Sequence, residues 1–470
     1  MRWLSPESKL ENPKSKMDVH TPSPAEIPRL RRVLGLWDLI LYGVVAVTPS
    51  APVTVFGLAL TMSKGHAVDT ILAAMVAMVL TGFSYGRMAA LYPAAGSAYT
   101  YVGRGLNPHL GFLAGWAMLL DYVVIPLFCV IYGSLAIQRL YPQVPFLVWS
   151  ACIACAMTYL NLRGIRSTAR ANQVLISLMM CVLLVFIFLA IRFVTRQQGW
   201  SGLFTLQPFF NPQTFRLGSV ATATSFAALT YLGFDSVTTL AEDVHNPRRN
   251  VLLATVLVCA FTGIFGGLLV YLGQVVWPDY STFSNIETAF MDVTRRVGGP
   301  ILFQAMAILL VIANIGAGLT GQVGAARLLF GMGRDNVLPR RIFSYLDPRR
   351  NTPTRNIWLI GILAFVGAQF MSYELTAEIL NFGAFLGFIG VNIATVCQFY
   401  VLDQSGRSKN FFADALVPGL GAVFCFMIWW GLAIPAKIAG GIWFAVGLMH
   451  TAIRTRGFQT RPAMIDFSES

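Results

Sequence analysis

The feature that most constrains this chain is a series of twelve long apolar runs. The runs are continuous, and a helix made from such a run can cross about 30 Å of hydrocarbon. A helix satisfies its own backbone hydrogen bonds in lipid, whereas a barrel strand would alternate apolar and polar residues. The runs therefore predict an all-α polytopic membrane protein with twelve transmembrane helices. They occupy residues 35–60, 69–91, 110–137, 146–162, 171–194, 217–240, 251–276, 301–332, 357–371, 376–401, 412–432 and 435–452.

The composition disfavours the soluble classes of protein. Hydrophobic residues make up 56% of the 470 residues and charged residues 12%, whereas soluble domains average about 25% charged residues. So few charges could not cover the surface of a soluble enzyme, a secreted module or a disordered chain. The sequence also lacks a recognisable nucleotide-binding motif, catalytic triad or metal-ligand spacing. We therefore expect neither an enzyme nor direct use of ATP.

The distribution of Lys and Arg predicts the orientation of the chain. If the twelve runs cross the membrane in turn, 26 of the 34 basic side chains lie on the side of both tails, and eight lie on the other side. Basic residues concentrate in cytoplasmic loops. We therefore expect a multi-pass protein of the cell (inner) membrane with both termini in the cytoplasm. This bias explains most of the net charge of +13 without a nucleic acid partner.

Two of the runs carry signals for an interruption at membrane depth. The first contains VTPSAPV at residues 47–53, in which Pro49 and Pro52 each remove a backbone donor and clash with the preceding turn. The sixth contains Gly233, which permits a break without requiring one. Interrupted spans at matching places of two five-helix halves indicate a binding site built on an inverted repeat. A packing kink is the alternative for the first run.

Two acidic residues lie in the central part of the apolar runs, Asp121 in the third and Asp235 in the sixth. No Lys or Arg falls in the central half of any run. A charge at this depth costs about 2.5–3.5 kcal/mol on insertion scales and usually has a function. Each acid is therefore a candidate binding residue, with hydrogen bonding between helices as the alternative.

Three groups of motifs follow one another along the chain. They are YPAAGSAYTY at residues 92–101, GFD at 233–235 with EDVHNPR at 242–248, and ARLLF at 326–330 with GRDNVLP at 333–339. In this order they resemble the amino acid–polyamine–organocation (APC) transporter superfamily, over about residues 30–455. The resemblance implies a secondary transporter with a five-plus-five inverted repeat of the LeuT type and two C-terminal helices.

The expected organisation has four parts. A disordered cytoplasmic tail occupies residues 1–34, and the transport core with helices 1–10 occupies residues 35–402. Helices 11 and 12 occupy residues 403–453, and a cytoplasmic tail occupies residues 454–470.

Within the superfamily, several details are similar to bacterial putrescine importers. The matching strings are LDY at residues 120–122, DSVTTL at 235–240 and NFGA at 381–384. Those importers tend to carry an acid near the position of Thr54, where this chain is neutral. The resemblance implies import of a small cationic amine, with an amino acid permease of the same fold as the alternative.

The two alternatives predict different contacts. An amino acid would place its carboxylate against free backbone amides of the interrupted first run, and its ammonium group against carbonyls near the break in the sixth. A diamine needs acceptors at both ends and no nearby cation, which the two acids provide, and Tyr122 and Tyr231 add cation–π contact. The candidate binding residues are Thr48, Pro49, Ser50, Ala51, Asp121, Tyr122, Ala227, Leu229, Tyr231, Gly233 and Asp235.

We expect an ion gradient to drive transport. A carboxyl group in a low-dielectric environment can carry a proton, so Asp235 and the interfacial Glu242 are the candidate coupling residues, with sodium as the alternative ion. Glu242 can instead be a solvated helix end paired with Arg248 or Arg249. No cofactor or metal is expected. The expected partners are the substrate and membrane lipid, and the choice between monomer and homodimer is open.

Overall fold

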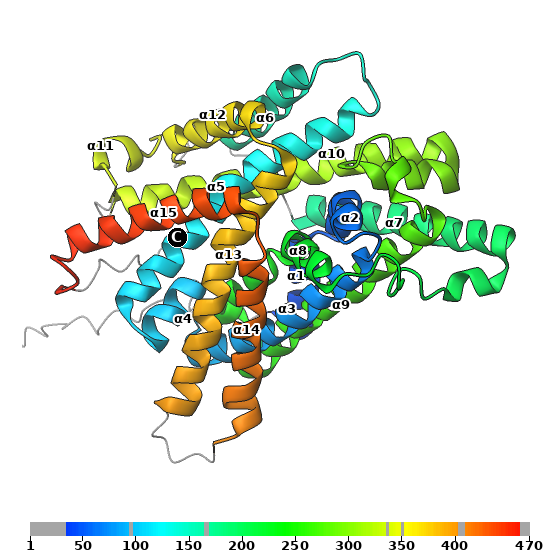
Figure 1. Ribbon diagram of the computed structural model, residues 1–470. Helices are drawn as coiled ribbons and strands as arrows, with labels where there is room; N and C mark the ends of the chain where they lie inside the picture. The colour runs from blue at the N-terminus through cyan, green and yellow to red at the C-terminus, as the bar shows by residue number, and fades with distance from the viewer. Residues whose placement is uncertain are drawn as a thin grey trace, which may run out of the picture.

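The computed structural model describes residues 34–93, 97–163, 169–334, 338–348, 352–402 and 409–460. These residues form an all-helical structure without a β-strand (Figure 1). An isolated bridge pairs Leu34 with Val244 and ties the start of the first span to the segment that follows the sixth. Almost all of the predicted N-terminal tail and residues 461–470 lie outside the described ranges.

The helices follow the order of the predicted runs. The α-helices are α1 (Leu36–Val47), α2 (Ala51–Met62), α3 (Ala67–Leu91), α4 (Ser97–Gly105), α5 (Pro108–Gln138), α6 (Phe146–Leu162), α7 (Ala169–Gln198), α8 (Leu217–Ala227), α9 (Pro247–Val276), α10 (Ala289–Arg334), α11 (Arg340–Phe343), α12 (Thr354–Phe370), α13 (Tyr373–Val396), α14 (Val417–Trp430) and α15 (Ile434–Arg454). The 3₁₀ segments are η1 (Trp200–Phe204), η2 (Ala228–Tyr231), η3 (Phe234–Asp243) and η4 (Tyr280–Thr282), and the π segments are η5 (Cys397–Val401) and η6 (Phe412–Leu416).

Eight helices in the described residues are long and apolar enough to cross a membrane, and the number rises to ten if each of two bent pairs is one span. The first pair is α1 with α2, bent by 48°, and the second joins residues 217–231 to residues 234–241 with a bend of 40°. These pairs coincide with the two runs in which the sequence indicates an interruption. The shorter apolar helices α6 and α12, of 17 residues each, correspond to the fourth and ninth runs.

The structure extends the eighth run toward the N-terminus. The prediction begins this span at residue 301, whereas α10 begins at Ala289 and continues to Arg334. Gly299 interrupts it with φ 66° and ψ −161°, and Pro300 follows. Since these angles are not helical and favour glycine, residues 289–298 form a short helix that is bent away from the span.

The interrupted spans lie in the interior of the molecule. Figure 1 shows α1, α2 and α8 surrounded by longer helices, and α2 contacts both α8 and α9. The helices α3 and α9 approach each other closely because glycine lies at their contact. At Gly86 of α3, for example, an added Cβ would lie only 2.4 Å from Leu252 Cα of α9. Such small-residue contacts are typical of helix packing in membranes. On the other side, α5 packs against α10 and α13.

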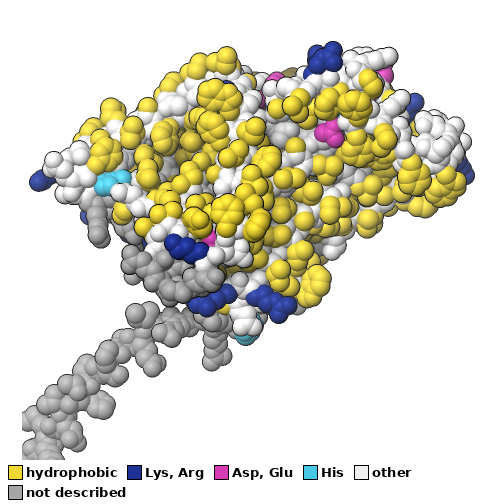
Figure 2. All heavy atoms as spheres, turned by 60° about the horizontal axis from the view of Figure 1, so that its bottom comes forward, with side chains coloured by type: hydrophobic (Ala, Val, Ile, Leu, Met, Phe, Trp, Pro, Cys, Tyr) yellow, Lys and Arg dark blue, Asp and Glu magenta, His cyan; other side chains and the backbone are white. Residues whose placement is uncertain are grey.

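The surface of the molecule is largely apolar. The face in Figure 2 is covered mainly by hydrophobic side chains, and the Lys and Arg side chains lie toward its edges. In α7 and in α15, only 22% of the most apolar stretch of the helix is buried inside the protein. An exposed apolar surface of this extent fits contact with lipid acyl chains.

Candidate substrate site at the two helix breaks

The first break lies at residues 48–50, between α1 and α2. Thr48 has φ 64° and ψ 106°, which no helix accommodates, and Pro49 has no amide hydrogen to donate. The helix resumes at Ala51, and Pro52 sits in its first turn, where proline is tolerated. Pro49 therefore lies in the break itself, whereas Pro52 belongs to the start of α2.

Backbone hydrogen bonds already occupy most of the amides that the sequence offered for a carboxylate. The Thr48 N–H donates to Val44 O at 3.1 Å, and the Ala51 N–H donates to Thr48 O at 2.9 Å. Within the described backbone, the Ser50 N–H donates no such bond. Ser50 is also 2% exposed, so one buried amide is left to meet a substrate.

The second break is held against the first by Gly233. This residue has φ 102°, a conformation that favours glycine. A Cβ at this position would lie 2.8 Å from Ala46 O. The break in the sixth span therefore requires glycine for two reasons, its backbone angle and the close approach of the end of α1.

The predicted carbonyls of the sixth span accept hydrogen bonds within the chain. Thr230 Oγ1 donates to Ala227 O at 2.9 Å, and the Leu232 N–H donates to Leu229 O at 3.1 Å. A carbonyl oxygen has two lone pairs, so Leu229 O can accept a second bond from an ammonium group. Asn381 of α13 supports this end of α8, because its Nδ2 donates to Ser225 O at 2.7 Å.

Tyr231 does not direct its hydroxyl toward the other predicted residues. It is fully buried, and its Oη donates to Ile71 O of α3 at 2.7 Å. The ring belongs to the apolar core that also contains Phe234 and Tyr85. The hydrogen bond fixes the segment just before Gly233 to α3.

The structure brings the two intramembrane acids together. Asp121 is 8% exposed and Asp235 is 7% exposed, and their carboxyl groups are close enough to interact electrostatically. Asp235 lies in the first turn of η3, two residues after Gly233, whereas Asp121 comes from α5. We call Asp121 and Asp235 the central acid pair.

Several buried polar atoms around the central acid pair lack a hydrogen-bond partner. The clearest are Asp121 Oδ1 and Tyr85 Oη. Beside them, Ser97 Oγ is within reach of the Asp235 carboxyl group and Tyr101 Oη is within reach of Thr238. Asp235 acts electrostatically on both tyrosines. Buried polar groups in native proteins are nearly always paired. Unpaired atoms gathered around two carboxylates therefore mark a place for a polar ligand or for water.

Reasoning from sequence missed Tyr85, Ser97 and Tyr101 as site residues. Ser97 and Tyr101 belong to the string at residues 92–101, but nothing local in the sequence placed them beside Asp235. Tyr85 lies inside an apolar run, and its hydroxyl was the only available signal. Its ring packs against Tyr101 at 5.8 Å and against Phe234 at 5.4 Å between centroids.

Two further tyrosines with partly exposed side chains interact with the central acid pair. Tyr122 is 36% exposed and Tyr42 of α1 is 40% exposed. The two side chains interact with each other and with Asp235. Tyr122 follows Asp121 in α5 and stays a predicted cation–π partner for the substrate.

No basic side chain neutralises the central acid pair within the described residues. The ion pairs found there join Arg87 to Asp414 and Arg139 to Asp292. The backbone of Glu242 lies in η3, but its side chain is outside the described residues. The central acid pair can therefore bind a positively charged ligand, with hydroxyl and aromatic groups around the ligand.

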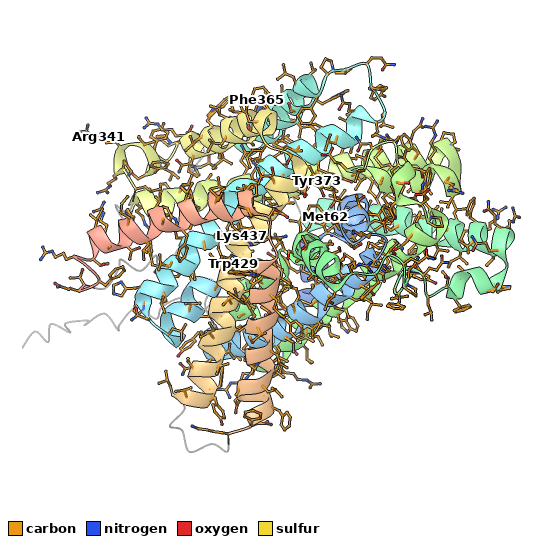
Figure 3. The ribbon with its side chains drawn as sticks, in the orientation of Figure 1. Met62, Arg341, Phe365, Tyr373, Trp429 and Lys437 are labelled. Atoms are coloured by element: carbon orange, nitrogen blue, oxygen red, sulfur yellow. The ribbon has the colours of Figure 1, made fainter. Side chains whose placement is uncertain are left out.

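On the side of the breaks away from the central acid pair, the aromatic side chain of Tyr373 packs against both interrupted spans. Tyr373 Oη donates to Thr54 O of α2 at 2.8 Å, and its ring lies 5.9 Å from that of Phe226 in α8. Tyr373 therefore contacts the second half of the first span and the first half of the sixth. Figure 3 labels Tyr373 at the start of α13 and Met62 at the end of α2.

Interrupted helices that face one another inside a lipid-exposed helical bundle, with buried acids beside the breaks, define the class of polytopic membrane transporters. The family model described as amino acid permease matches residues 50–434. The chain belongs to this family, as its resemblance to the superfamily implies. Its members are transporters, so the expectation that the chain is not an enzyme is confirmed.

Three curated relatives illustrate the range of the family. The chain is 29% identical to the low-affinity putrescine importer PlaP of Escherichia coli (strain K12), covering 93% of this chain and 97% of that protein. It is 27% identical to the methylthioribose transporter of Bacillus subtilis (strain 168), covering 89% and 92%. It is 24% identical to the branched-chain amino acid permease BcaP of the same organism, covering 89% and 92%.

Proposed function

We propose that this protein is a secondary active importer of a small cationic amine, with putrescine as the representative substrate. The observation that carries the proposal is the central acid pair, two buried carboxylates that interact electrostatically and form no ion pair with a basic side chain among the described residues. A diamine supplies positive charge and hydrogen-bond donors without bringing a negative group. The unpaired hydroxyls and Tyr122 add acceptors and an aromatic face.

An amino acid permease of the same fold is the second candidate function. The Ser50 amide supports it, because this group can meet a carboxylate at the break in the first span. A carboxylate in the site would, however, add a third negative charge to those of Asp121 and Asp235. This repulsion favours the amine, and PlaP, the relative named as a putrescine importer, matches nearly the whole chain.

The proposed architecture is twelve membrane spans, with two inverted repeats of five and two C-terminal helices. It treats each bent pair as one span and adds α6 and α12 to the spans. The protein would lie in a bacterial inner membrane. With the basic residues on the cytoplasmic side of that membrane, both termini face the cytoplasm. Alternating access would then expose the breaks first to one side and then to the other.

We further propose that a proton gradient drives uptake through Asp235. This residue interacts with Asp121, Tyr101 and Tyr122 and lies directly after the second break. A proton on this carboxyl group would change both the charge and the hydrogen bonds at the site. Substrate release and proton release would thereby be linked.

Counterflow uptake into proteoliposomes tests the substrate class. Purified protein is reconstituted into vesicles loaded with unlabelled putrescine, and uptake of labelled putrescine is measured beside a panel of neutral, acidic and cationic amino acids. We expect putrescine to exchange and neutral amino acids not to compete. Exchange of a neutral amino acid without putrescine exchange would favour the second candidate.

A further inference from the structure

A second group of acidic and aromatic side chains lies on the other side of the breaks from the central acid pair. Glu287 precedes α10, and Glu374 lies in the first turn of α13. Their carboxyl groups interact, and Glu287 also acts on the hydroxyl groups of Tyr132 and Tyr373. In the proposed orientation, this group faces the outside of the cell.

The hydroxyl of Tyr132 is the most informative atom of this group. Tyr132 is fully buried, and its Oη has no hydrogen-bond partner. Its ring lies 5.2 Å from that of Tyr373, whose own hydroxyl donates to Thr54 O. Phe128 completes the aromatic cluster, with its centroid 5.2 Å from that of Tyr373. A buried hydroxyl without a partner, within electrostatic reach of a carboxylate, indicates a place for a bound donor.

The charge of Glu287 is also unbalanced. It makes no ion pair within the described residues, and the nearby Arg139 is held by Asp292 and Ser284. Partial burial raises the pKa of Glu287, and the neighbouring carboxyl group of Glu374 raises it further. A cation bound between these residues would relieve both effects.

This group lies directly outside the candidate substrate site. Tyr373 holds Thr54, which follows Ser50 by four residues, about one helical turn. The carbonyl of Ile286, next to Glu287, packs so closely on α2 that a Cβ at Gly57 would lie 1.9 Å from it. The loop before α10 and the second half of the first span therefore adjoin, and a ligand here is about one turn from the break.

We propose that Glu287, Tyr132 and Tyr373 form an outer subsite that binds the ammonium group of the substrate before it enters the site between the breaks. This inference rests on the proposed function. The carboxylate of Glu287 accepts one N–H of the ammonium group and Tyr132 Oη accepts another. The aromatic rings of Tyr132 and Tyr373 supply cation–π contact.

Uptake of radiolabelled putrescine into cells tests this subsite, because the substrate then reaches the protein from the outer face alone. Wild type is compared with Glu287→Gln, Tyr132→Phe and the control Asp279→Asn, at matched amounts of protein in the membrane. Asp279 is an exposed acid in the same loop, and it caps η4 through the Ser281 N–H. The amount and the elution profile of each purified variant show that it folds.

We expect Glu287→Gln to raise the half-saturation concentration about fivefold and Tyr132→Phe about threefold, with the maximal rate unchanged. Asp279→Asn should match wild type. Equal half-saturation in wild type and Glu287→Gln, or an effect of Asp279→Asn as large as that of Glu287→Gln, would overturn the subsite. A wild-type protein that does not take up putrescine would instead contradict the proposed function.

Discussion

Gly233 lies directly against the carbonyl oxygen of Ala46, and a Cβ at residue 233 would be 2.8 Å from that oxygen. This contact joins the two interrupted spans at the point where each loses its regular backbone. It also explains how the residue after the break, Asp235 of η3, is kept at the end of α1. The positions of the breaks and of the central acid pair are therefore coupled.

Gly233→Ala should disrupt this contact. We expect a cost of about 1–3 kcal/mol, because alanine must adopt φ 102° and its methyl group meets Ala46 O. The midpoint of thermal unfolding in detergent should fall by several degrees, and transport should be lost. Gly218→Ala is the matched control, since a Cβ there meets nothing within 4 Å. Equal stability of the two variants would contradict the role of Gly233.

Pro49→Ala together with Pro52→Ala should impair transport more than folding. Replacing Pro49 restores an amide in the break, and replacing Pro52 removes the ring that fixes the first turn of α2. The chain can then extend its helical hydrogen bonds across residues 48–50 and cover the Ser50 amide. The initial rate of putrescine uptake should fall to a small fraction of the wild-type rate at a similar unfolding midpoint. Transport at the wild-type rate would show that the interruption is not needed.

Asp235→Asn should separate coupling from binding. A neutral amide mimics the protonated acid, so we expect the variant to lose accumulation of putrescine against a gradient but to keep exchange at zero gradient. Gradient-driven uptake and exchange are measured in the same proteoliposomes. Loss of both activities would assign Asp235 to cation binding alone, and retained accumulation would reject its coupling role.

The outer subsite should depend on pH through Glu287. Since the pKa of Glu287 is raised by burial and by Glu374, it gains a proton at a higher pH than an ordinary glutamate, whose pKa is about 4.3. As the external pH falls toward the pKa of Glu287, this carboxylate loses its negative charge and binds the ammonium group less well. The half-saturation concentration of wild type for putrescine should therefore rise. The other groups that face Glu287 are the carboxyl group of Glu374 and the hydroxyl groups of Tyr132 and Tyr373. We expect a smaller rise in Glu287→Gln, and parallel pH profiles for the two proteins would count against this role.

The two breaks could be predicted from sequence because their causes are local. Pro49 removes a donor wherever it stands in a helix, and Gly233 tolerates a positive φ regardless of its neighbours. The kink at Gly299 has the same local origin, but that position lies outside the predicted run. The positions of the other spans could be predicted from the apolar runs, because a run long enough to cross the hydrocarbon is recognised from its own residues, without knowledge of distant contacts.

The side chains that complete the site could not be predicted in the same way. Tyr85 and Tyr101 are near Asp235 only because α3 and α4 pack beside η3. The sequence predicts Tyr231 as a cation–π partner, but it gives no sign that the hydroxyl of this residue donates to Ile71 O in α3. A single sequence specifies where a helix breaks more readily than which distant helix will face the break.

The most direct test of the central claim is binding of putrescine to purified wild type and to Asp121→Asn, measured by isothermal titration calorimetry in detergent. Asp121 is buried, and its Oδ1 has no hydrogen-bond partner. Removing its charge should therefore weaken binding by about tenfold or more while the protein remains folded. We expect wild type to bind putrescine and the dissociation constant of Asp121→Asn to rise by at least this factor. Equal affinity in the two proteins would contradict recognition of the amine by the central acid pair.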